Sequence, residues 1–170
     1  VPEGEEGLTD EEKAKKAVMR AKDFAQNQYQ KAADYIESLG IDKPIHIGET
    51  GWASVSGGFY GVKGSRAADE YKGKLFYENI REWTNSKGIS CFYFEAFDEK
   101  WKDAENVDGS ENHFGLINLK GEARYGIWKL VKQGVFNGLT RLEKPKSKTY
   151  NGSKKALLKD VLVPSIEYQR

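Results

Sequence analysis

The sequence predicts an α/β fold that forms part of a barrel of alternating strands and helices. Two segments, residues 44–49 and 89–99, are almost wholly apolar and end in acidic residues, and amphipathic stretches alternate with them. Near-continuous apolar strands are typical of parallel sheets that helices cover on both faces. A closed eight-stranded barrel needs about 250 residues, so this chain of 170 residues is expected to form only a portion of one.

The first predicted element is a long amphipathic helix that follows Thr9. Thr9 and Glu12 have the spacing of a capping box, in which each side chain accepts a hydrogen bond from the other residue's backbone amide. Gly40 is expected to close the helix, because glycine readily adopts the left-handed conformation needed there. Apolar residues recur at intervals of three and four between these limits: Ala14, Ala17, Val18, Ala21, Phe24, Ala25, Tyr29, Ala32, Ala33 and Ile36.

Pro44 opens the first predicted strand, which carries Glu49 near its end. Ile45 and Ile47 alternate, and a period of two places Glu49 on the same face. An unpaired carboxylate is costly inside a core, so we expect Glu49 where the apolar row opens into a site. The following Thr50-Gly-Trp52 supplies a turn and an aromatic ring. A carboxylate beside a flat ring at a strand end indicates sugar chemistry.

A loop rich in Gly and Ser, residues 53–64, carries Phe59 and Tyr60. Two interpretations of this loop remain open: a mobile surface loop, or a loop that contacts the substrate. Ser65 is the predicted cap of the second helix, and Gly88 its predicted end. The buried stripe of this helix is expected to comprise Ala68, Tyr71, Leu75, Phe76, Ile80 and Trp83.

The second strand is predicted over residues 89–99, with acidic residues at its C-terminal end. A period of two places Glu95, Phe97 and Glu99 on one face. The single cysteine, Cys91, lies in the apolar part, so we expect a buried, unreactive thiol and neither a disulfide nor a cysteine-based metal site. Both strands carry their acids at the C-terminal end, where barrels of this kind place their chemistry.

A loop over residues 100–117, a third amphipathic helix over residues 121–136 and a basic tail complete the chain. Ser153 is expected to cap a short helix in the tail. We therefore divide the chain into residues 1–137, the barrel portion, and residues 138–170, an extension expected to pack on the barrel. A linker into another domain is the alternative for the extension.

Composition narrows the class of partner. Lys and Arg (27) balance Asp and Glu (26), so the net charge is +1, without the basic excess that nucleic-acid binding requires. No apolar stretch approaches the length of a membrane span. Two scattered histidines predict no metal site: His113 is expected to hydrogen-bond within its loop, and His46 to be structural, on the face opposite Glu49. A neutral substrate fits this composition best.

Three segments, in this order, resemble glycoside hydrolase family 17: Ile47-Gly-Glu-Thr-Gly-Trp-Ala-Ser54, Phe94-Glu-Ala-Phe-Asp-Glu-Lys-Trp-Lys102 and Glu111-Asn-His-Phe-Gly-Leu116. The family comprises retaining β-1,3-glucanases and related glucosyltransferases on a (β/α)8 barrel. The resemblance covers roughly residues 10–137 and implies a bacterial-type laminarinase, of which this chain would be the C-terminal portion, about strands 6/7 to 8. It implies no cofactor, and a secreted, periplasmic or cell-surface location.

The resemblance also implies a role for each matching residue. Glu49 matches the catalytic nucleophile, and Trp52 matches the tryptophan that follows it. Glu99 and Lys102 match an acid and a lysine that line the site and support catalysis, and Glu111 matches an acid near the cleft. The residues expected to bind β-1,3-glucan are Trp52, Glu95, Trp101, Glu111, Phe59 and Tyr60.

The proton donor of the family is a glutamate directly after an asparagine, and this chain contains no Asn-Glu dipeptide. A retaining glycosidase needs two carboxyl groups about 5–5.5 Å apart, one as nucleophile and one as acid and then base. We therefore expect the donor upstream, in the N-terminal remainder of the barrel, and expect this chain alone to be inactive. Lys102 could keep Glu49 ionised, and Glu99 could hold Lys102 as an ion pair.

Several alternatives remain open at this stage. Glu49 could instead cap the following loop, and Glu99 with Lys102 could be an ordinary surface pair. Trp52 and Trp101 could be packing residues rather than stacking platforms, and Glu95 a hydrogen-bond partner of a site residue. As whole functions, the alternatives are a glucosyltransferase, a non-catalytic glucan-binding protein and a different retaining barrel hydrolase of cellulase type.

Overall fold

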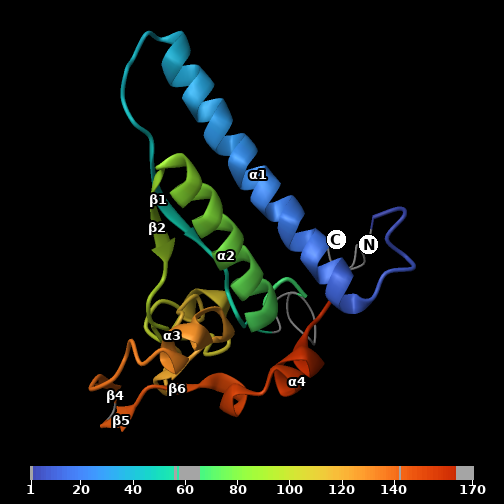
Figure 1. Cartoon of the computed structure of the whole chain (residues 1–170), viewed down its shortest axis with the longest axis vertical. Coiled ribbons are helices and arrows are strands. Elements are labelled where there is room, and N and C mark those ends of the chain that lie inside the picture. Colours follow the sequence, from blue (N-terminus) through green and yellow to red (C-terminus); the bar gives the residue numbers. More distant parts are fainter. Residues whose placement is uncertain (1, 56, 58–65, 142, 164–170) are drawn as a thin grey trace.

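Two long helices and a pair of parallel strands are the largest elements of the structure (Figure 1). The computed structural model describes residues 2–55, 57, 66–141 and 143–163. Helices α1 (Asp10–Ser38) and α2 (Glu70–Lys87) pack side by side and cover one face of strands β1 (His46–Gly51) and β2 (Ser90–Phe94). The remaining elements are short: β3 (Glu122–Ala123), α3 (Trp128–Lys132), β4 (Thr140–Arg141), β5 (Lys144–Pro145), β6 (Ser147–Lys148) and α4 (Lys154–Leu157).

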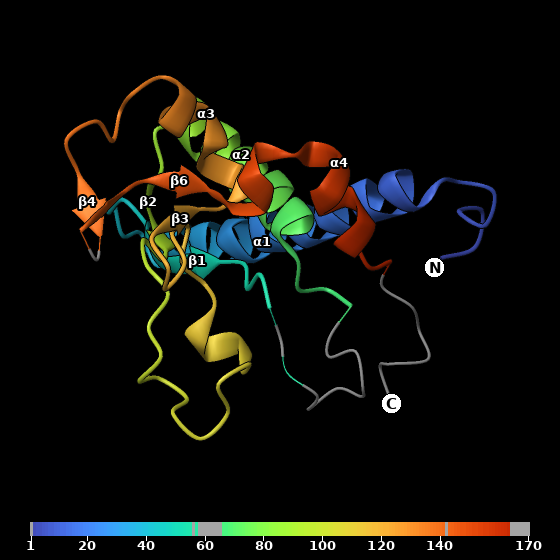
Figure 2. The ribbon, with the colours of Figure 1, turned by 90° about the horizontal axis from the view of Figure 1, so that it is seen from below.

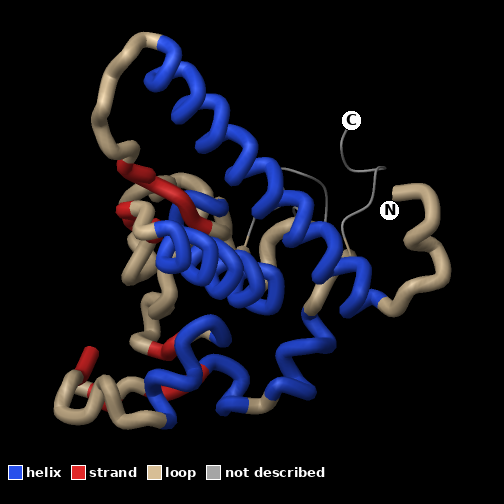
Figure 3. Tube along the Cα trace, turned by 45° about the horizontal axis from the view of Figure 1, so that its top comes forward, coloured by secondary structure: helices blue, strands red, loops and turns tan. Residues whose placement is uncertain are grey.

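Helix α1 begins and ends where its capping signals predicted. The Thr9 hydroxyl accepts the Glu12 amide at 3.3 Å, and the Glu12 carboxylate accepts the Thr9 amide at 2.9 Å. Gly40 has the left-handed φ of 68°. Of the predicted apolar stripe, only Ala14 and Val18 are fully buried. Tyr29 still packs on Trp83 of α2, and only the last turns of α1 extend beyond α2 (Figure 3).

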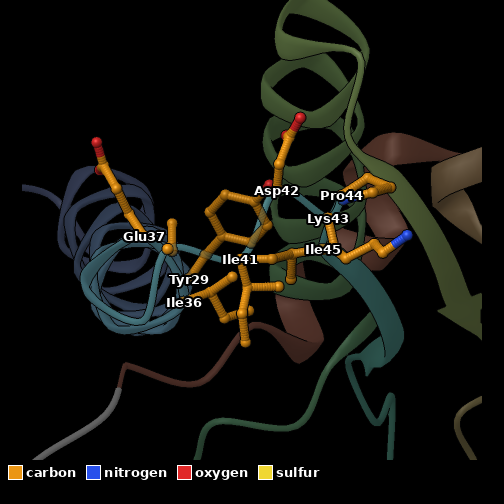
Figure 4. Close-up of a pocket in the computed structure, with 10 residues that line it drawn as sticks. Tyr29, Ile36, Glu37, Ile41, Asp42, Lys43, Pro44 and Ile45 are labelled. Carbon is orange, nitrogen blue, oxygen red and sulfur yellow. The ribbon is translucent and has the colours of Figure 1, made fainter.

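Hollows lie beside the loop that connects α1 to β1. One, of about 480 Å³, lies between the end of α1 and the start of β1, and Figure 4 shows its lining side chains. A second, of about 330 Å³, shares Tyr29 and Ile45 with the first and reaches Glu49. The apolar residues that line the first hollow are Tyr29, Ala33, Ile36, Ile41, Pro44 and Ile45.

Strands β1 and β2 are parallel, as predicted, but β1 contains a bulge. Ile47 pairs with Cys91 and Thr50 with Tyr93, so β1 advances three residues while β2 advances two. Gly48 and Glu49 therefore stand together opposite one residue of β2, as in a β-bulge. The bulge interrupts the strict alternation, but Ile45, Ile47 and Glu49 line one hollow, which agrees with the prediction that Glu49 shares their face.

His46 contacts residues on the face of the strands that the helices leave uncovered. Cys91 and Tyr93 pack against the helices, whereas Phe92 between them is 67% exposed on the other face. His46 contacts Phe92 with its ring, at 4.5 Å between centroids, and Ser90 Oγ with Nδ1, at 2.8 Å. His46 therefore lies away from the hollow that Glu49 lines, and its contacts agree with the structural role expected for it.

Helix α2 begins later than predicted. Its cap is Asp69, whose carboxylate accepts the backbone amide of Lys72 at 2.8 Å, and the predicted cap, Ser65, lies outside the described residues. Asp69 is the better cap because its acceptor stands next to the first helical turn. Gly88 ends the helix with a φ of 64°, as predicted.

The second strand and the third helix are both shorter than predicted. Strand β2 ends at Phe94, and the predicted face of Glu95, Phe97 and Glu99 is wrong because these residues follow the strand. Residues 121–136 hold the short strand β3, a 3-10 turn and the five-residue α3. The helix is interrupted because β3 pairs with β6 and the Arg124 amide donates to the Leu116 carbonyl at 2.9 Å.

The last described segment packs back on the helices (Figures 1 and 2). Ser153 caps α4, as predicted, by accepting the Ala156 amide at 3.2 Å. Leu157 is buried in one cluster with Ala14 of α1 and Tyr71 of α2. The division of the chain after residue 137 stays a prediction. Among the residues described, no helix has the length and apolar character that a membrane crossing requires.

Candidate functional site

The acidic residues of the two strands leave the sheet at the same end. Gly51 at the end of β1 pairs with Phe94 at the end of β2, so Glu49 and Glu95 lie at the same, C-terminal edge. Gly51 permits this close approach, because a methyl group on its Cα would overlap the Phe94 carbonyl group and press on the Phe114 ring. The C-terminal edge of parallel strands is where α/β proteins place their sites.

Lys102 gathers two of the predicted acids around its ammonium group. Its Nζ lies 3.0 Å from Glu95 Oε2 and 3.1 Å from Glu99 Oε2, and 3.7 Å from the centre of the Phe94 ring. The side chains of Lys102 and Glu95 are only 16% and 13% exposed, and that of Glu99 is 35% exposed. The predicted ion pair between Glu99 and Lys102 is thus present, and Glu95 adds a second carboxylate to it.

The two carboxylates differ in their electrostatics. Burial raises the pKa of Glu95, and the hydrogen bond from Lys102 offsets only part of this effect. The hydrogen bond from Lys102 lowers the pKa of the more exposed Glu99. Burial alone would lower the pKa of Lys102, but its two acidic partners raise it. Glu95 is therefore the acid of this cluster that takes up a proton more readily.

One oxygen of Glu95, Oε1, is buried without a hydrogen-bond partner among the described residues, whereas Oε2 contacts Lys102. A buried carboxylate oxygen without a partner is energetically unfavourable. A hydroxyl group of a ligand could remove this cost by donating a hydrogen bond.

Glu49 itself is exposed at the end of β1. None of the described side chains forms a hydrogen bond or ion pair with its carboxylate, and Lys102 contacts Glu95 and Glu99 instead. The carboxylate is therefore open to solvent and to a reacting group. The expected proximity of Lys102 and Glu49 stays a prediction.

The two candidate tryptophans have different surroundings. Trp52 packs against Phe76 of α2, at 5.0 Å between rings, and its Nε1 donates to the Ala67 carbonyl at 2.9 Å. The packing alternative therefore accounts for Trp52. Trp101 is 69% exposed beside Lys102, so its ring is free to stack on a ligand.

The third motif folds into a compact loop. Glu111 is exposed within a 3-10 turn, and the buried Asn112 next to it donates to the carbonyls of Asp103 and Asn106. His113 is a loop hydrogen-bonder, as predicted: Nδ1 lies 3.3 Å from Asp98 Oδ2 and Nε2 lies 3.0 Å from the Val107 carbonyl. The remaining two predicted site residues, Phe59 and Tyr60, lie outside the described residues.

A buried ion network beneath the site was missed by the sequence reasoning. Arg124 Nη2 lies 2.5 Å from Asp98 Oδ2, and its Nη1 lies 3.3 Å from Glu70 Oε1. The sequence signal was weak: only Arg124 stands between apolar neighbours, Ala123 and Tyr125, where a buried charge would require a partner. Arg124 is 26 residues from Asp98 and 54 residues from Glu70 in the sequence, so their spacing does not indicate that they pair.

The comparisons with known proteins agree with these motifs. No family model matches the chain. A solved endo-laminarinase from Formosa Hel1_33_131 is 58% identical with a TM-score of 0.90, over 95% of this chain and 41% of that one. A glucan 1,3-beta-glucosidase of Arthroderma benhamiae is 30% identical over 107 residues, 63% of this chain and 32% of the relative.

A third similarity is to an active-site mutant of the Rhizomucor miehei beta-1,3-glucanosyltransferase, solved in complex with laminaritriose. It is 27% identical with a TM-score of 0.50, over 64% of this chain and 36% of that one. The chain thus spans less than half the length of each of these three proteins. The predicted resemblance is confirmed, and the chain is a relative of the glycoside hydrolase family 17 β-1,3-glucanases.

Proposed function

We propose that this chain is the C-terminal part, from about strand 6 or 7 to strand 8, of a (β/α)8 barrel that hydrolyses β-1,3-glucan. The observation that carries the proposal is the 58% identity to an endo-laminarinase over 95% of the chain. The positions of Glu49 near the end of β1 and of Glu95 directly after β2, both at the C-terminal edge of the strands, support it. Both features are expected of a retaining glycosidase on a barrel.

In the proposed reaction Glu49 is the nucleophile. One of its oxygens attacks the anomeric carbon while the bond from that carbon to the leaving oxygen breaks, and a second carboxylic acid donates its proton to this oxygen. Water then gives its proton to that carboxylate and attacks the anomeric carbon, releasing Glu49. The second carboxylic acid belongs to the part of the relatives that this chain does not span.

The Lys102 cluster would form a polar wall of the sugar site. Glu95 Oε1, buried and without a partner among the described residues, would accept a hydrogen bond from a sugar hydroxyl. Lys102 would hold both carboxylates in place and compensate their charge. The exposed ring of Trp101 would offer a flat apolar surface to the next sugar ring.

The rest of the barrel would complete the sheet and the site. Two strands are too few to form an independently stable sheet, and the face of Phe92 is uncovered. Additional strands would cover this face and supply the acid. We therefore expect the 170 residues alone to bind glucan weakly and to hydrolyse none.

The test uses the longer parent protein with a 2-deoxy-2-fluoro laminaribiosyl fluoride, which traps a glycosyl-enzyme. Intact mass and peptide mapping should find one label, on the peptide that contains Glu49. E49Q should remove both the label and laminarin hydrolysis, whereas E82Q, on the exposed side of α2, should keep both. A label on another peptide would refute the assignment of Glu49.

Two outcomes would favour other functions. If the parent binds laminarin but neither hydrolyses it nor takes the label, a glucan-binding protein is the better description. If β-1,4-glucan is the preferred substrate, a hydrolase of cellulase type replaces the proposal.

A glucosyltransferase is the second candidate, favoured by the similarity to the glucanosyltransferase of R. miehei. It would use the same covalent intermediate but pass the sugar to another glucan chain instead of water. A time course of products from laminari-oligosaccharides separates the two. Products longer than the substrate indicate transfer, and products that are only shorter indicate hydrolysis.

A further inference from the structure

Asp98 is the most enclosed charged side chain next to the Lys102 cluster, and the proposed reaction gives it no role. Its side chain is 1% exposed. Arg124 Nη2 lies 2.5 Å from Oδ2, and His113 Nδ1 lies 3.3 Å from the same oxygen. The Gly115 amide donates to Oδ1 at 2.9 Å. Both carboxylate oxygens are thus occupied, so Asp98 is built to hold structure rather than to bind a ligand.

Arg124 connects Asp98 to the first turn of α2. Its Nη1 lies 3.3 Å from Glu70 Oε1. The other Glu70 oxygen accepts the Tyr125 amide at 3.1 Å and the Thr149 hydroxyl at 2.7 Å. One guanidinium therefore spans two buried acids from different parts of the chain. A planar group with donors in fixed directions suits this bridging, and an ammonium does not.

The backbone around Asp98 is held as firmly as its side chain. The Asp98 amide donates to the Ile117 carbonyl at 2.9 Å, and the Ile117 amide donates to the Ala96 carbonyl at 3.0 Å. The Leu116 amide donates to the Glu95 carbonyl at 2.9 Å. The segment 95–98 is therefore clamped along its length against residues 114–117.

The clamped segment is the one that sets the site. Glu95, the first residue of this segment, and Glu99, which directly follows it, supply the two carboxylates that hold Lys102, and the segment ends four residues before Lys102. A shift of Asp98 would move both carboxylates relative to β1 and Glu49. Small displacements of groups around a reacting centre can reduce rates by about 100-fold.

We infer that Asp98 and Arg124 are positioning residues for the Glu95–Lys102–Glu99 cluster: they act through the segment 95–99 and touch no substrate. The inference rests on the proposed glucan hydrolysis. It does not depend on which residue supplies the acid.

The test compares D98N, R124K and the matched control D23N in the parent protein. Asp23 is an exposed residue of α1 whose carboxylate, among the described residues, forms an ion pair with Lys22 alone. For D98N we expect kcat on laminari-oligosaccharides to fall about 10- to 100-fold, while KM changes less than about threefold, since no substrate contact is removed. The kcat of R124K should lie between the kcat values of D98N and D23N, because a lysine can still pair with one of the two acids.

Crystal structures of the variants supply a readout that does not depend on activity. In D98N the contact between Lys102 Nζ and Glu95 should lengthen or break while α1, α2 and the two strands keep their places. A folded D98N that retains wild-type kcat and the Lys102 contact would overturn the inference. If the wild-type parent does not hydrolyse laminarin, it is the proposed function that fails, and the Lys102 contact in D98N still decides the positioning role.

Discussion

Gly51 and Phe94 bring the ends of β1 and β2 into closer contact than any other residue at position 51 would allow. A Cβ atom at Gly51 would overlap the Phe94 carbonyl oxygen and lie 3.3 Å from the Phe114 ring. The obstacle is largely backbone, which cannot rotate away as a flexible side chain can. The glycine of the Glu-Thr-Gly-Trp motif is therefore a packing requirement of the site.

The substitution G51A should destabilise the fold by at least about 2 kcal/mol, because overpacking a closed position forces the backbone to shift. Urea unfolding followed by circular dichroism measures this change. The matched control is G7A, since a Cβ at Gly7 meets no atom within 4 Å. Equal stabilities of the two variants would show that β1 and β2 separate more easily than the structure indicates.

A pair of tryptophan variants separates packing from ligand contact. W52A should lower the unfolding free energy by about 3 kcal/mol, because the ring packs on Phe76 and leaves a cavity. W101A should leave stability nearly unchanged, since Trp101 is largely exposed, and should raise KM for longer laminari-oligosaccharides in the parent protein. Unchanged KM in W101A would remove Trp101 from the proposed sugar site.

Removing Lys102 should change the pH profile of the parent protein as well as its rate. In K102M two carboxylates face each other without a cation, and the pKa of Glu95, already raised by burial, should rise further. We expect kcat/KM to fall about 100-fold. In the plot of kcat/KM against pH, the decline on the acidic side should move to higher pH. The control K100M removes an exposed lysine two residues away and should change neither property.

The features that the sequence predicted well depend on local chemistry. The capping box of Thr9 and Glu12 and the left-handed Gly88 act within a single helical turn, so their spacing alone indicates them. The positions of the acids at strand ends followed from the apolar runs before them. The ion pair of Glu99 and Lys102 followed from a motif with a known family pattern.

The features that the sequence predicted badly depend on distant parts of the chain. The bulge at Gly48 and Glu49 is visible only in the register with β2. The third helix is interrupted because β6, far along the chain, pairs with β3. Arg124 bridges Asp98 and Glu70 because three segments that are separate in the sequence lie together in the fold. Residue spacing in the sequence does not indicate such tertiary contacts.

The contact of His113 with Asp98 should make stability depend on pH in a defined direction. The hydrogen bond to the Asp98 carboxylate raises the pKa of His113, against the opposing effect of burial. The folded state therefore binds the imidazole proton more tightly than the unfolded state, whose pKa is near 6.5. This contribution to stability is fully present below pH 6.5 and is lost as the pH rises through the folded pKa.

The measurement is the unfolding free energy of the wild-type parent protein and of its H113Q variant over a series of pH values that begins below 6.5. The difference between the two proteins should be largest at the acidic end and should shrink as the imidazole loses its proton. E105Q, which removes an exposed charge in the same loop, serves as the control and should follow the wild type. A difference that stays constant or grows with pH would mean that His113 stabilises its loop as a neutral ring, through its contact with the Val107 carbonyl alone.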